Sequence, residues 1–309
     1  MESEPRYGFI DKEGNLVIEP RFVEVGYFSE GLASMRDGEL VGYINLDGEV
    51  AIEPQFANAS DFKEGLACAL IEDAVGYINP VGKIVIDAQF EEAEDFSEGM
   101  AVVGKDEQYG YINTDGKLAI EYHYSDSEDF SDGLASVELD ARFGYVDKGG
   151  ELIIPANFAL AEQFSNGLAP ATLEELWGWI DKSGEFVIDA QFDGVGRFVE
   201  GLAPVQTEGR WGFIDREGSF VIEPQFIEAG EFTDGLAIVD IDGKWGFIGP
   251  DGTIAIQPVF DVATDFFEGL ARVEVESTWG FIDKTGKIVI GPRFADAGDF
   301  SQGRAFVAL

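Results

Sequence analysis

The sequence is nearly devoid of the two side chains on which much nucleophilic catalysis and most zinc binding depend. It has one cysteine, Cys68, and one histidine, His123, among 309 residues. A single cysteine excludes an intramolecular disulfide, and a catalytic triad or dyad would have only His123 as its base. A zinc site would need carboxylates for most of its ligands. We therefore predict no catalytic residue, no metal site, no cofactor and no enzymatic activity.

Positive charge is also scarce, since 20 Lys and Arg residues stand against 60 Asp and Glu residues, a formal net charge of −40. Nucleic-acid binding needs clustered cations that neutralise phosphates, so nucleic acid is not an expected partner. The acidic residues are scattered along the chain rather than gathered in a tail. This pattern leaves three explanations open: surface solubility, attraction of a basic partner or of cations, and adaptation to high salt.

Long apolar runs are absent, and none approaches the roughly 18 residues that span a bilayer. The first residues, MESEPRYGFI, have neither a basic segment nor an apolar segment of a secretory signal. We expect a cytoplasmic protein without membrane insertion. The chain is nevertheless 45% hydrophobic with 26 Phe, which favours a packed core over disorder.

What the chain has instead is an internal repeat of 34 residues. The interval separates each member of a glycine series from the next: Gly8, Gly42, Gly76, Gly110, Gly144, Gly178, Gly212, Gly246 and Gly280. A second glycine series from Gly31 and a phenylalanine series from Phe28 keep the same step. We predict a six-residue N-terminal extension (1–6) followed by a single repeat domain (7–309). Its nine repeats start near Tyr7, Val41, Val75, Tyr109, Phe143, Trp177, Trp211, Trp245 and Trp279.

The composition of each repeat indicates strands rather than helices. Glycine recurs at least twice per copy, and apolar residues alternate with a spacing of two, which excludes the helical hairpin of the same length. In the copy from Trp211, WGFID reads as a strand, and Asp215 with Gly218 as a tight turn with a G1 bulge. SFVIEP then reads as a strand whose two faces are both apolar, which predicts burial between layers. The unit is a three-stranded meander, with the next segment as a fourth short strand or a packed loop.

A 34-residue meander cannot bury two apolar faces alone, so neighbouring copies must stack. Two all-β architectures meet this requirement: a closed ring of the β-propeller type and an open superhelical β-solenoid array. The chain starts with the strand YGFI and ends with GRAFVAL, which corresponds to the strand that elsewhere precedes it in a hairpin. Pairing of these two ends would close a ring, whereas an open array would leave two unpaired edges. This observation favours the ring slightly.

The recurring pattern WGFID..G..VI.P.F..A..F..GLA.V resembles the WG repeat, also called KWG, of bacterial proteins. The resemblance covers essentially the whole chain, and KWGFIGPDGTIAIQPVFDVATDFFEGLARV from Lys244 is a close example. The signature Trp is absent from the first five copies, where Tyr7, Val41, Val75, Tyr109 and Phe143 stand. The resemblance implies a β-rich binding or scaffolding protein and supplies no catalytic residue.

Two sets of residues are candidates for binding. The five residues before each repeat vary while their flanks do not, as expected of hairpin tips at a rim that contacts a partner. The acidic members of this set are Asp37, Glu39, Asp106, Glu107, Glu174, Glu175, Asp242 and Glu276. The second set consists of Trp177, Trp211, Trp245 and Trp279, which would present flat aromatic surface or pack between copies.

Other polar residues have structural interpretations at this stage. The recurrent turn carboxylates, such as Asp11 and Asp215, suit hydrogen bonding within a turn better than calcium binding. Cys68 is predicted to be a small core residue and His123 a surface residue in a connecting loop. We therefore predict a non-catalytic scaffold that binds a protein partner, with a basic protein as one possibility, through an acidic surface. The alternative is a propeller-like ring that binds a small molecule, a carbohydrate or a cation, with hydrolysis of the ligand as a further option.

Overall fold

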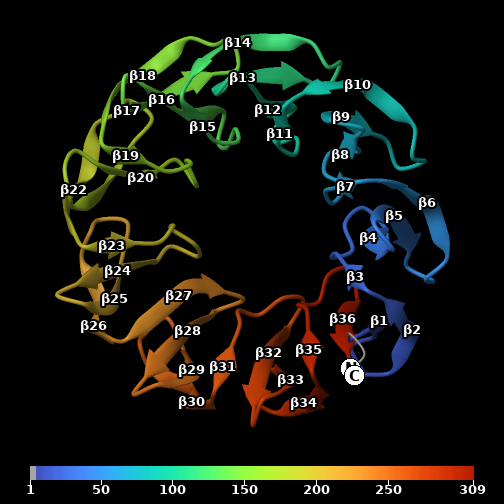
Figure 1. Ribbon diagram of the computed structural model, residues 1–309. Helices are drawn as coiled ribbons and strands as arrows, with labels where there is room; N and C mark the ends of the chain where they lie inside the picture. The colour runs from blue at the N-terminus through green and yellow to red at the C-terminus, as the bar shows by residue number, and fades with distance from the viewer. Residues whose placement is uncertain (1–4) are drawn as a thin grey trace. The chain divides into compact units, whose positions relative to one another are not determined.

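The computed structural model describes residues 5–309, and this part of the chain contains strands and turns but no helix. Its strands form nine four-stranded sheets (Figure 1). In a representative sheet, a two-residue strand β3 (Glu24–Val25) is followed by β4 (Leu32–Asp37), β5 (Leu40–Asn45) and β6 (Val50–Phe56), in that spatial order. The predicted three-stranded meander and its fourth short strand are thus confirmed, as is the all-β class. Residues 1–4 of the predicted extension lie outside the described residues.

The chain divides into two compact units, of which the first contains residues 5–61 and 221–309 and the second residues 62–220. The strands of the first unit not yet given are β1 (Tyr7–Ile10), β2 (Leu16–Phe22), β7 (Asn58–Ala59), β26 (Phe220–Phe226, whose first residue belongs to the second unit), β27 (Glu228–Thr233), β28 (Leu236–Ile241), β29 (Lys244–Ile248), β30 (Ile254–Phe260), β31 (Val262–Ala263), β32 (Leu270–Val275), β33 (Thr278–Asp283), β34 (Ile288–Phe294), β35 (Asp296–Ala297) and β36 (Ala305–Ala308). Those of the second unit are β8 (Ala67–Ile71), β9 (Ala74–Ile78), β10 (Ile84–Phe90), β11 (Glu92–Ala93), β12 (Met100–Lys105), β13 (Gln108–Asn113), β14 (Leu118–Tyr124), β15 (Asp126–Ser127), β16 (Leu134–Leu139), β17 (Arg142–Asp147), β18 (Leu152–Phe158), β19 (Leu160–Ala161), β20 (Ala169–Thr172), β21 (Trp177–Ile180), β22 (Phe186–Phe192), β23 (Gly194–Val195), β24 (Ala203–Thr207) and β25 (Arg210–Ile214).

The turn after the first strand of each repeat has the predicted geometry. The Asp11 Oδ1 atom accepts hydrogen bonds from the backbone amides of Glu13 at 3.1 Å and Asn15 at 2.8 Å. Gly14 has φ of 82° and donates its amide to the Asp11 carbonyl at 2.9 Å. Glycine fits there because a left-handed residue closes the turn without a Cβ clash. The interpretation of these recurrent carboxylates as turn residues is confirmed by such bonds.

The two ends of the chain share one sheet. Strand β1 pairs antiparallel with β36, with Tyr7 opposite Ala308 and Phe9 opposite Phe306, and the sheet order is β2-β1-β36-β35. In Figure 1 the blue β1 and β2 accordingly lie beside the red β35 and β36. This pairing is what a closed propeller requires and what an open array lacks, so the propeller-like interpretation is confirmed.

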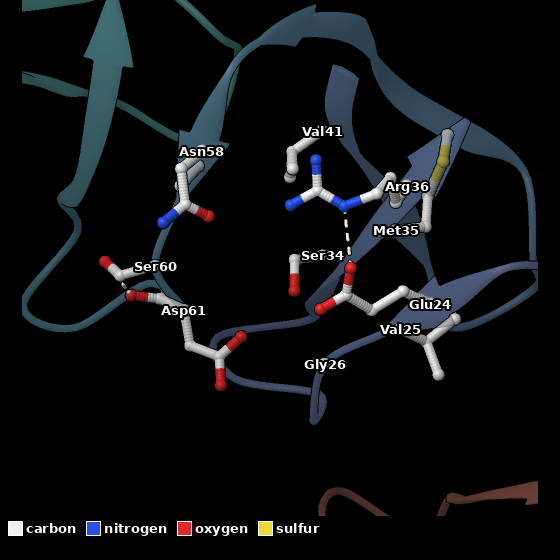
Figure 2. Close-up of a pocket in the computed structure, with 11 residues that line it drawn as sticks. Glu24, Val25, Gly26, Ser34, Met35, Arg36, Val41, Asn58, Ser60 and Asp61 are labelled. Atoms are coloured by element: carbon white, nitrogen blue, oxygen red, sulfur yellow. Dashed lines mark hydrogen bonds and ion pairs between the residues drawn. The ribbon is translucent and has the colours of Figure 1, made fainter. Parts of the chain in front are cut away.

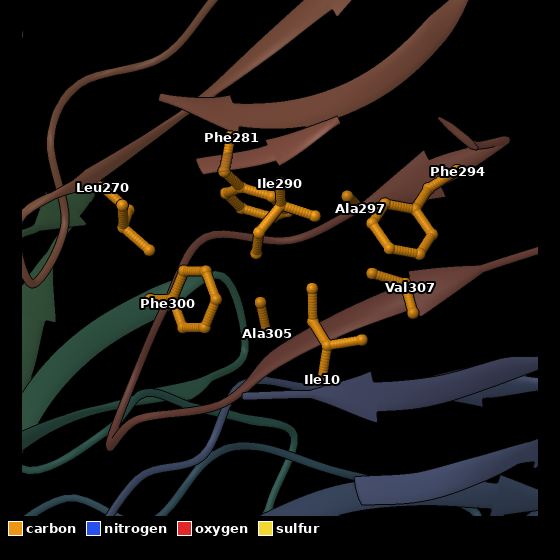
Figure 3. Packing of buried hydrophobic residues seen from close by; sticks show 9 residues of the cluster. All are labelled: Ile10, Leu270, Phe281, Ile290, Phe294, Ala297, Phe300, Ala305 and Val307. Carbon is orange, nitrogen blue, oxygen red and sulfur yellow. The ribbon is translucent and has the colours of Figure 1, made fainter. Parts of the chain in front are cut away.

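Apolar side chains are buried between consecutive sheets rather than within one. The cluster in Figure 3 combines Phe281 of β33 and Ile290 of β34 with Val307 of β36 and Ile10 of β1. Phe281 also contacts Phe300, the phenylalanine of the next sheet, with ring centroids 5.0 Å apart. Within this unit, consecutive sheets therefore cover each other's apolar sides, as the repeat length requires.

The prediction that SFVIEP is buried on both faces is wrong. On β26 Ile222 and Phe226 are buried, each with 4% exposure, whereas Phe220 and Val221 are 39% and 45% exposed. Phe220 touches the core only through an edge contact with the buried Phe192 of the preceding sheet, with ring centroids 6.2 Å apart. The exposed apolar residues of this strand are β-branched or aromatic, which are the residue types that strands prefer even when half solvated.

A second recurrent turn links each copy to the next. Glu98 and Gly99 occupy a two-residue turn with φ of 52° and 80°. The Glu98 Oε2 atom accepts the backbone amide of Gly133 in the following copy at 3.1 Å, and Lys148 donates to the Glu98 carbonyl at 2.7 Å. The Ser97 hydroxyl donates to the Phe130 carbonyl at 2.8 Å. We call this set of hydrogen bonds between consecutive copies the latch. Glu98 therefore has a structural role in it.

Candidate functional site

The carboxylates predicted to bind a partner lie on exposed hairpin tips, which is the location predicted from the sequence. The tips join the second and third strands of a sheet, as between β12 and β13 or between β32 and β33. All eight side chains are exposed, namely those of Asp37, Glu39, Asp106, Glu107, Glu174, Glu175, Asp242 and Glu276. With respect to the rest of residues 5–309, none of these carboxylates makes a hydrogen bond or ion pair. Their role in binding stays a prediction.

Several tips hold acidic residues in backbone conformations that favour glycine or asparagine. Asp106 and Glu107 have φ of 51° and 59°, and Glu276 and Ser277 have φ of 49° and 63°. Two consecutive left-handed residues define a type I′ turn, for which Asn-Gly is the preferred sequence. In the turn at Glu98, the left-handed conformation of an acid is explained by the hydrogen bond that its carboxylate makes with the next copy. At the tips the carboxylate makes no such bond, and the backbone does instead. The Asp106 amide donates to Glu91 Oε2 at 3.0 Å, and the Glu276 amide donates to Asp261 Oδ2 at 3.1 Å.

The four predicted tryptophans are half-buried, one at the start of each of the last four copies. In the first unit, Trp279 packs against the core cluster that contains Phe281, and Trp245 packs against the one that contains Phe247. In the second unit lie Trp177 and Trp211. Packing accounts for one side of Trp245 and Trp279, and a binding role for these rings stays a prediction.

A further set of carboxylates was missed by sequence reasoning. It lies on the segment after the two-residue strand, and in the second unit it includes Glu128 and Asp129. Burial, followed by the charge of Glu162, raises the pKa of Glu128 to about 7. Burial also raises the pKa of Asp129. The signal that could have found this set is an acid directly before the recurrent phenylalanine, as at Asp61, Asp95, Asp129, Glu231, Asp265 and Asp299.

In the first unit the corresponding residue Asp265 lines a groove between two sheets. The groove has a volume of about 400 Å³, and its wall includes Ile238, Trp245 and Asp299. The Asp265 Oδ1 atom is buried and has no hydrogen-bond partner. Burial, followed by the charges of Glu231 and Asp299, raises the pKa of Asp265 to about 6.

A related groove in the same unit is more polar (Figure 2). It has a volume of about 280 Å³, and Val41 lies at its wall where the last four copies have Trp. The Nε atom of Arg36 donates to the Glu24 carboxylate at 2.6 Å, and Ser34 and Asp61 also line the groove. Figure 2 shows these groups facing a common space. They are suited to hydrogen bonding of a small polar molecule and include no nucleophile activated by a base.

Two sequence interpretations need correction. His123 lies within strand β14 rather than in a connecting loop, although it is exposed as expected, and its ring stacks on Tyr124 with centroids 3.9 Å apart. Cys68 is half-buried rather than a core residue, because its Sγ atom faces Asp95 Oδ1 at 3.9 Å at the junction of two copies. Neither residue is part of a cluster: within residues 5–309, no three His, Cys, Asp or Glu side chains are arranged to hold a metal ion.

Comparisons with known proteins agree with the repeat and the fold. A family model described as "WG containing repeat" matches the chain nine times, at residues 7–40, 42–73, 76–109, 109–142, 143–177, 177–211, 211–245, 245–279 and 279–309. No curated protein matches the sequence. Across the described part of the chain, no helix has the length and apolar character needed to cross a bilayer.

Among solved structures, the chain is similar to one titled as a eukaryotic initiation factor. That likeness has a TM-score of 0.67 at 10% identity and covers 99% of this chain and 98% of the other. Hsv2p of Kluyveromyces lactis is 9% identical over 73% of this chain and 92% of its own, with a TM-score of 0.43. At these identities the first likeness shows a shared fold and nothing about activity.

Proposed function

Because the chain belongs to the family of proteins built from WG-containing repeats, we propose that it is a non-catalytic scaffold that binds basic proteins through the acidic tips of its hairpins. The observation that carries this proposal is the absence of an intramolecular partner, within residues 5–309, for any of the eight tip carboxylates. Two other recurrent acids, represented by Asp11 and Glu98, are instead engaged in hydrogen bonds within a turn and to the next copy. The tip carboxylates remain available to a partner.

Backbone strain at the tips supports the same proposal. A non-glycine residue in the left-handed region costs on the order of 1 kcal/mol. Acidic residues at Glu107 and Glu276 therefore keep a conformation that glycine would adopt without strain. At these two tips the acid adds negative charge to the surface that a basic partner would contact, although Ala141 and Ser277 adopt the same conformation without charge.

The electrostatics of the whole chain favour cationic partners. With a formal charge of −40, the surface steers basic proteins toward itself and repels nucleic acid. Some carboxylates are partly buried beside one another, as Glu128 and Glu162 are. Ion pairs such as Lys63–Asp95 and Arg272–Asp299 neutralise only a few of the 60 acidic residues. The remaining excess of negative charge supports a role in binding cationic partners.

A pull-down from native lysate with matched variants tests the proposal. One variant neutralises the eight tip carboxylates as Asp→Asn and Glu→Gln. The control variant neutralises eight exposed carboxylates outside the tips, at Glu13, Glu19, Glu53, Asp87, Glu121, Asp189, Glu217 and Glu223, and so changes the net charge equally. Retained proteins are identified by mass spectrometry at ionic strengths of about 0.05 M and 0.5 M, between which screening of exposed charges becomes strong.

We expect the unmodified protein and the control variant to retain the same basic protein at low salt only. The tip variant should lose that protein by about 10-fold or more, since several charge contacts are removed. Equal retention by all three proteins would contradict binding through the tips. An equal loss in both variants would assign the attraction to net charge and would also contradict it.

A further inference from the structure

Arg272 on β32 shows how this repeat holds an arginine side chain. The Arg272 guanidinium lies over the Trp279 ring, 5.0 Å from its centroid. Its Nε atom donates to Asp299 Oδ1 at 2.7 Å, its Nη2 atom faces Asp299 Oδ2 at 3.4 Å, and its Nη1 atom donates to the Ala297 carbonyl. The cation is thus held by an aromatic face, a carboxylate and a backbone oxygen between two sheets.

We call the arrangement of Trp279, Asp299 and Ala297 around the guanidinium the arginine cradle. The same arrangement occurs one copy earlier, but without an arginine. Trp245, Ala263 and Asp265 precede Trp279, Ala297 and Asp299 by 34 residues, and they line the groove of about 400 Å³ described above. The residue 34 positions before Arg272 is Ile238. Ile238 is buried with 6% exposure and carries no donor.

Asp265 also lacks the second donor that Asp299 has. The Thr264 hydroxyl donates to Asp299 Oδ1 at 2.9 Å, whereas the residue that corresponds to Thr264 in the earlier copy is Gly230. A Cβ atom at Gly230 would lie 3.2 Å from Asp265 Oδ1, so the position is adjacent to the carboxylate. As a result, Asp265 Oδ1 is buried with no hydrogen-bond partner, a costly arrangement for a carboxylate.

We infer that the groove between Trp245 and Asp265 binds an arginine side chain supplied by a partner protein. The inference rests on the proposed function in that the arginine belongs to a basic partner, and it adds a contact in a groove that is separate from the hairpin tips. The groove suits a cation because Glu228, Asp265 and Asp299 line it and no Lys or Arg does. It suits arginine rather than lysine because a planar guanidinium stacks on Trp and matches a carboxylate with two N–H groups.

The first test measures binding of a small probe, N-acetyl-L-arginine N-methylamide, by isothermal titration and Trp fluorescence. We expect one saturable site per chain and binding at least several-fold weaker for the corresponding lysine amide. Asp265→Asn should weaken arginine-probe binding by about 10-fold, because it removes the charged partner of the guanidinium. Glu223→Gln, which removes the same charge from an exposed position outside the tips and the groove, should leave probe binding unchanged.

Two further variants make the result independent of any folding defect in Asp265→Asn. Ile238→Arg reproduces the Arg272 arrangement in the earlier copy, so it should block the probe and raise the melting temperature. Arg272→Ile empties the second cradle and should raise the stoichiometry from one probe to two. Unchanged binding to Ile238→Arg, or a probe that fails to saturate the unmodified protein, would overturn the inference.

The tip-neutralised variant separates this inference from the proposed function. It should bind the arginine probe as the unmodified protein does, since the groove is intact. Probe binding lost in that variant would contradict the groove as the site. Partner retention by the tip variant together with normal probe binding would refute the tips and leave the groove standing.

Discussion

Carboxylates in this chain differ in pKa and in hydrogen-bond partners because their surroundings differ, although they are the same residue types. The Ser183 hydroxyl and amide hold the pKa of Asp181 below its ordinary value in a turn. Burial and neighbouring acids instead raise the pKa of Glu128 to about 7. The tip acids have no partner within residues 5–309 and face solvent. Residue type alone therefore does not assign a role.

Glu128 gives a pH-dependent prediction for stability. Its pKa is about 7 in the folded chain against an ordinary value of 4.5, so the folded state prefers the protonated acid. The associated stability is complete below pH 4.5 and is lost as the pH rises through 7. The Glu128→Gln variant carries no ionisable group at this position, so it does not lose this stability as the pH rises. We expect a gain at pH 8 of about 1–2 kcal/mol, less than the full value of the shift because solvent screens a partly exposed group.

Urea unfolding of both proteins at pH 4 and pH 8 measures this difference. The groups that face Glu128 are Glu162, Asp126 and Asp129, all acidic, so no cation reverses the sign. The gain should vanish at pH 4, where the native side chain is already protonated. Glu107→Gln, on an exposed tip, should show the same small change at both pH values. A variant less stable than the unmodified protein at pH 8 would show that the ionised Glu128 is stabilised by a partner.

At the scale of the element, the two recurrent turns give opposite expectations for the same substitution. Replacing Asp106-Glu107 by Asn-Gly supplies the preferred type I′ sequence and should raise the free energy of unfolding by about 1 kcal/mol. Glu98→Gly removes left-handed strain as well, but it also removes the acceptor of the Gly133 amide and should give no gain. Thermal and urea unfolding of the two variants measure the contrast. Stabilisation by Glu98→Gly equal to that of the tip variant would refute the latch.

Strands and turns were predictable because they follow from local chemistry repeated nine times. Glycines that recur every 34 residues predict the turns, and apolar residues that alternate with a spacing of two predict the strands. The exposure of Phe220 and Val221 was not predictable in this way, because the order of strands in a sheet decides which faces are covered. The buried environment of Asp265 also depends on the neighbouring copy, where Gly230 and Ile238 replace donors present at Thr264 and Arg272.

At the scale of the whole molecule, the sequence indicated closure only through its two ends. A terminal strand cannot show by itself whether it has a partner, and the preference for a ring rested on the cost of unpaired edges. The pairing of β1 with β36 settles that alternative. The eight candidate carboxylates do lie on exposed hairpin tips, and their role in binding stays a prediction. The grooves required knowledge of how consecutive sheets face each other.

Val307 tests that closure directly. It lies on β36 opposite Gly8, is 0% exposed and belongs to the core cluster that includes Ile10. Val307→Asp should lower the free energy of unfolding by at least about 3 kcal/mol, because an unpaired charge in an apolar interior is strongly destabilising. Val289→Asp on β34, where the side chain is 40% exposed, is the matched control and should change stability by less than about 1 kcal/mol. Urea unfolding compares the two. If Val307→Asp were tolerated as well as Val289→Asp, the C-terminal strand would be solvated in solution, and the first and last copies would not share a sheet.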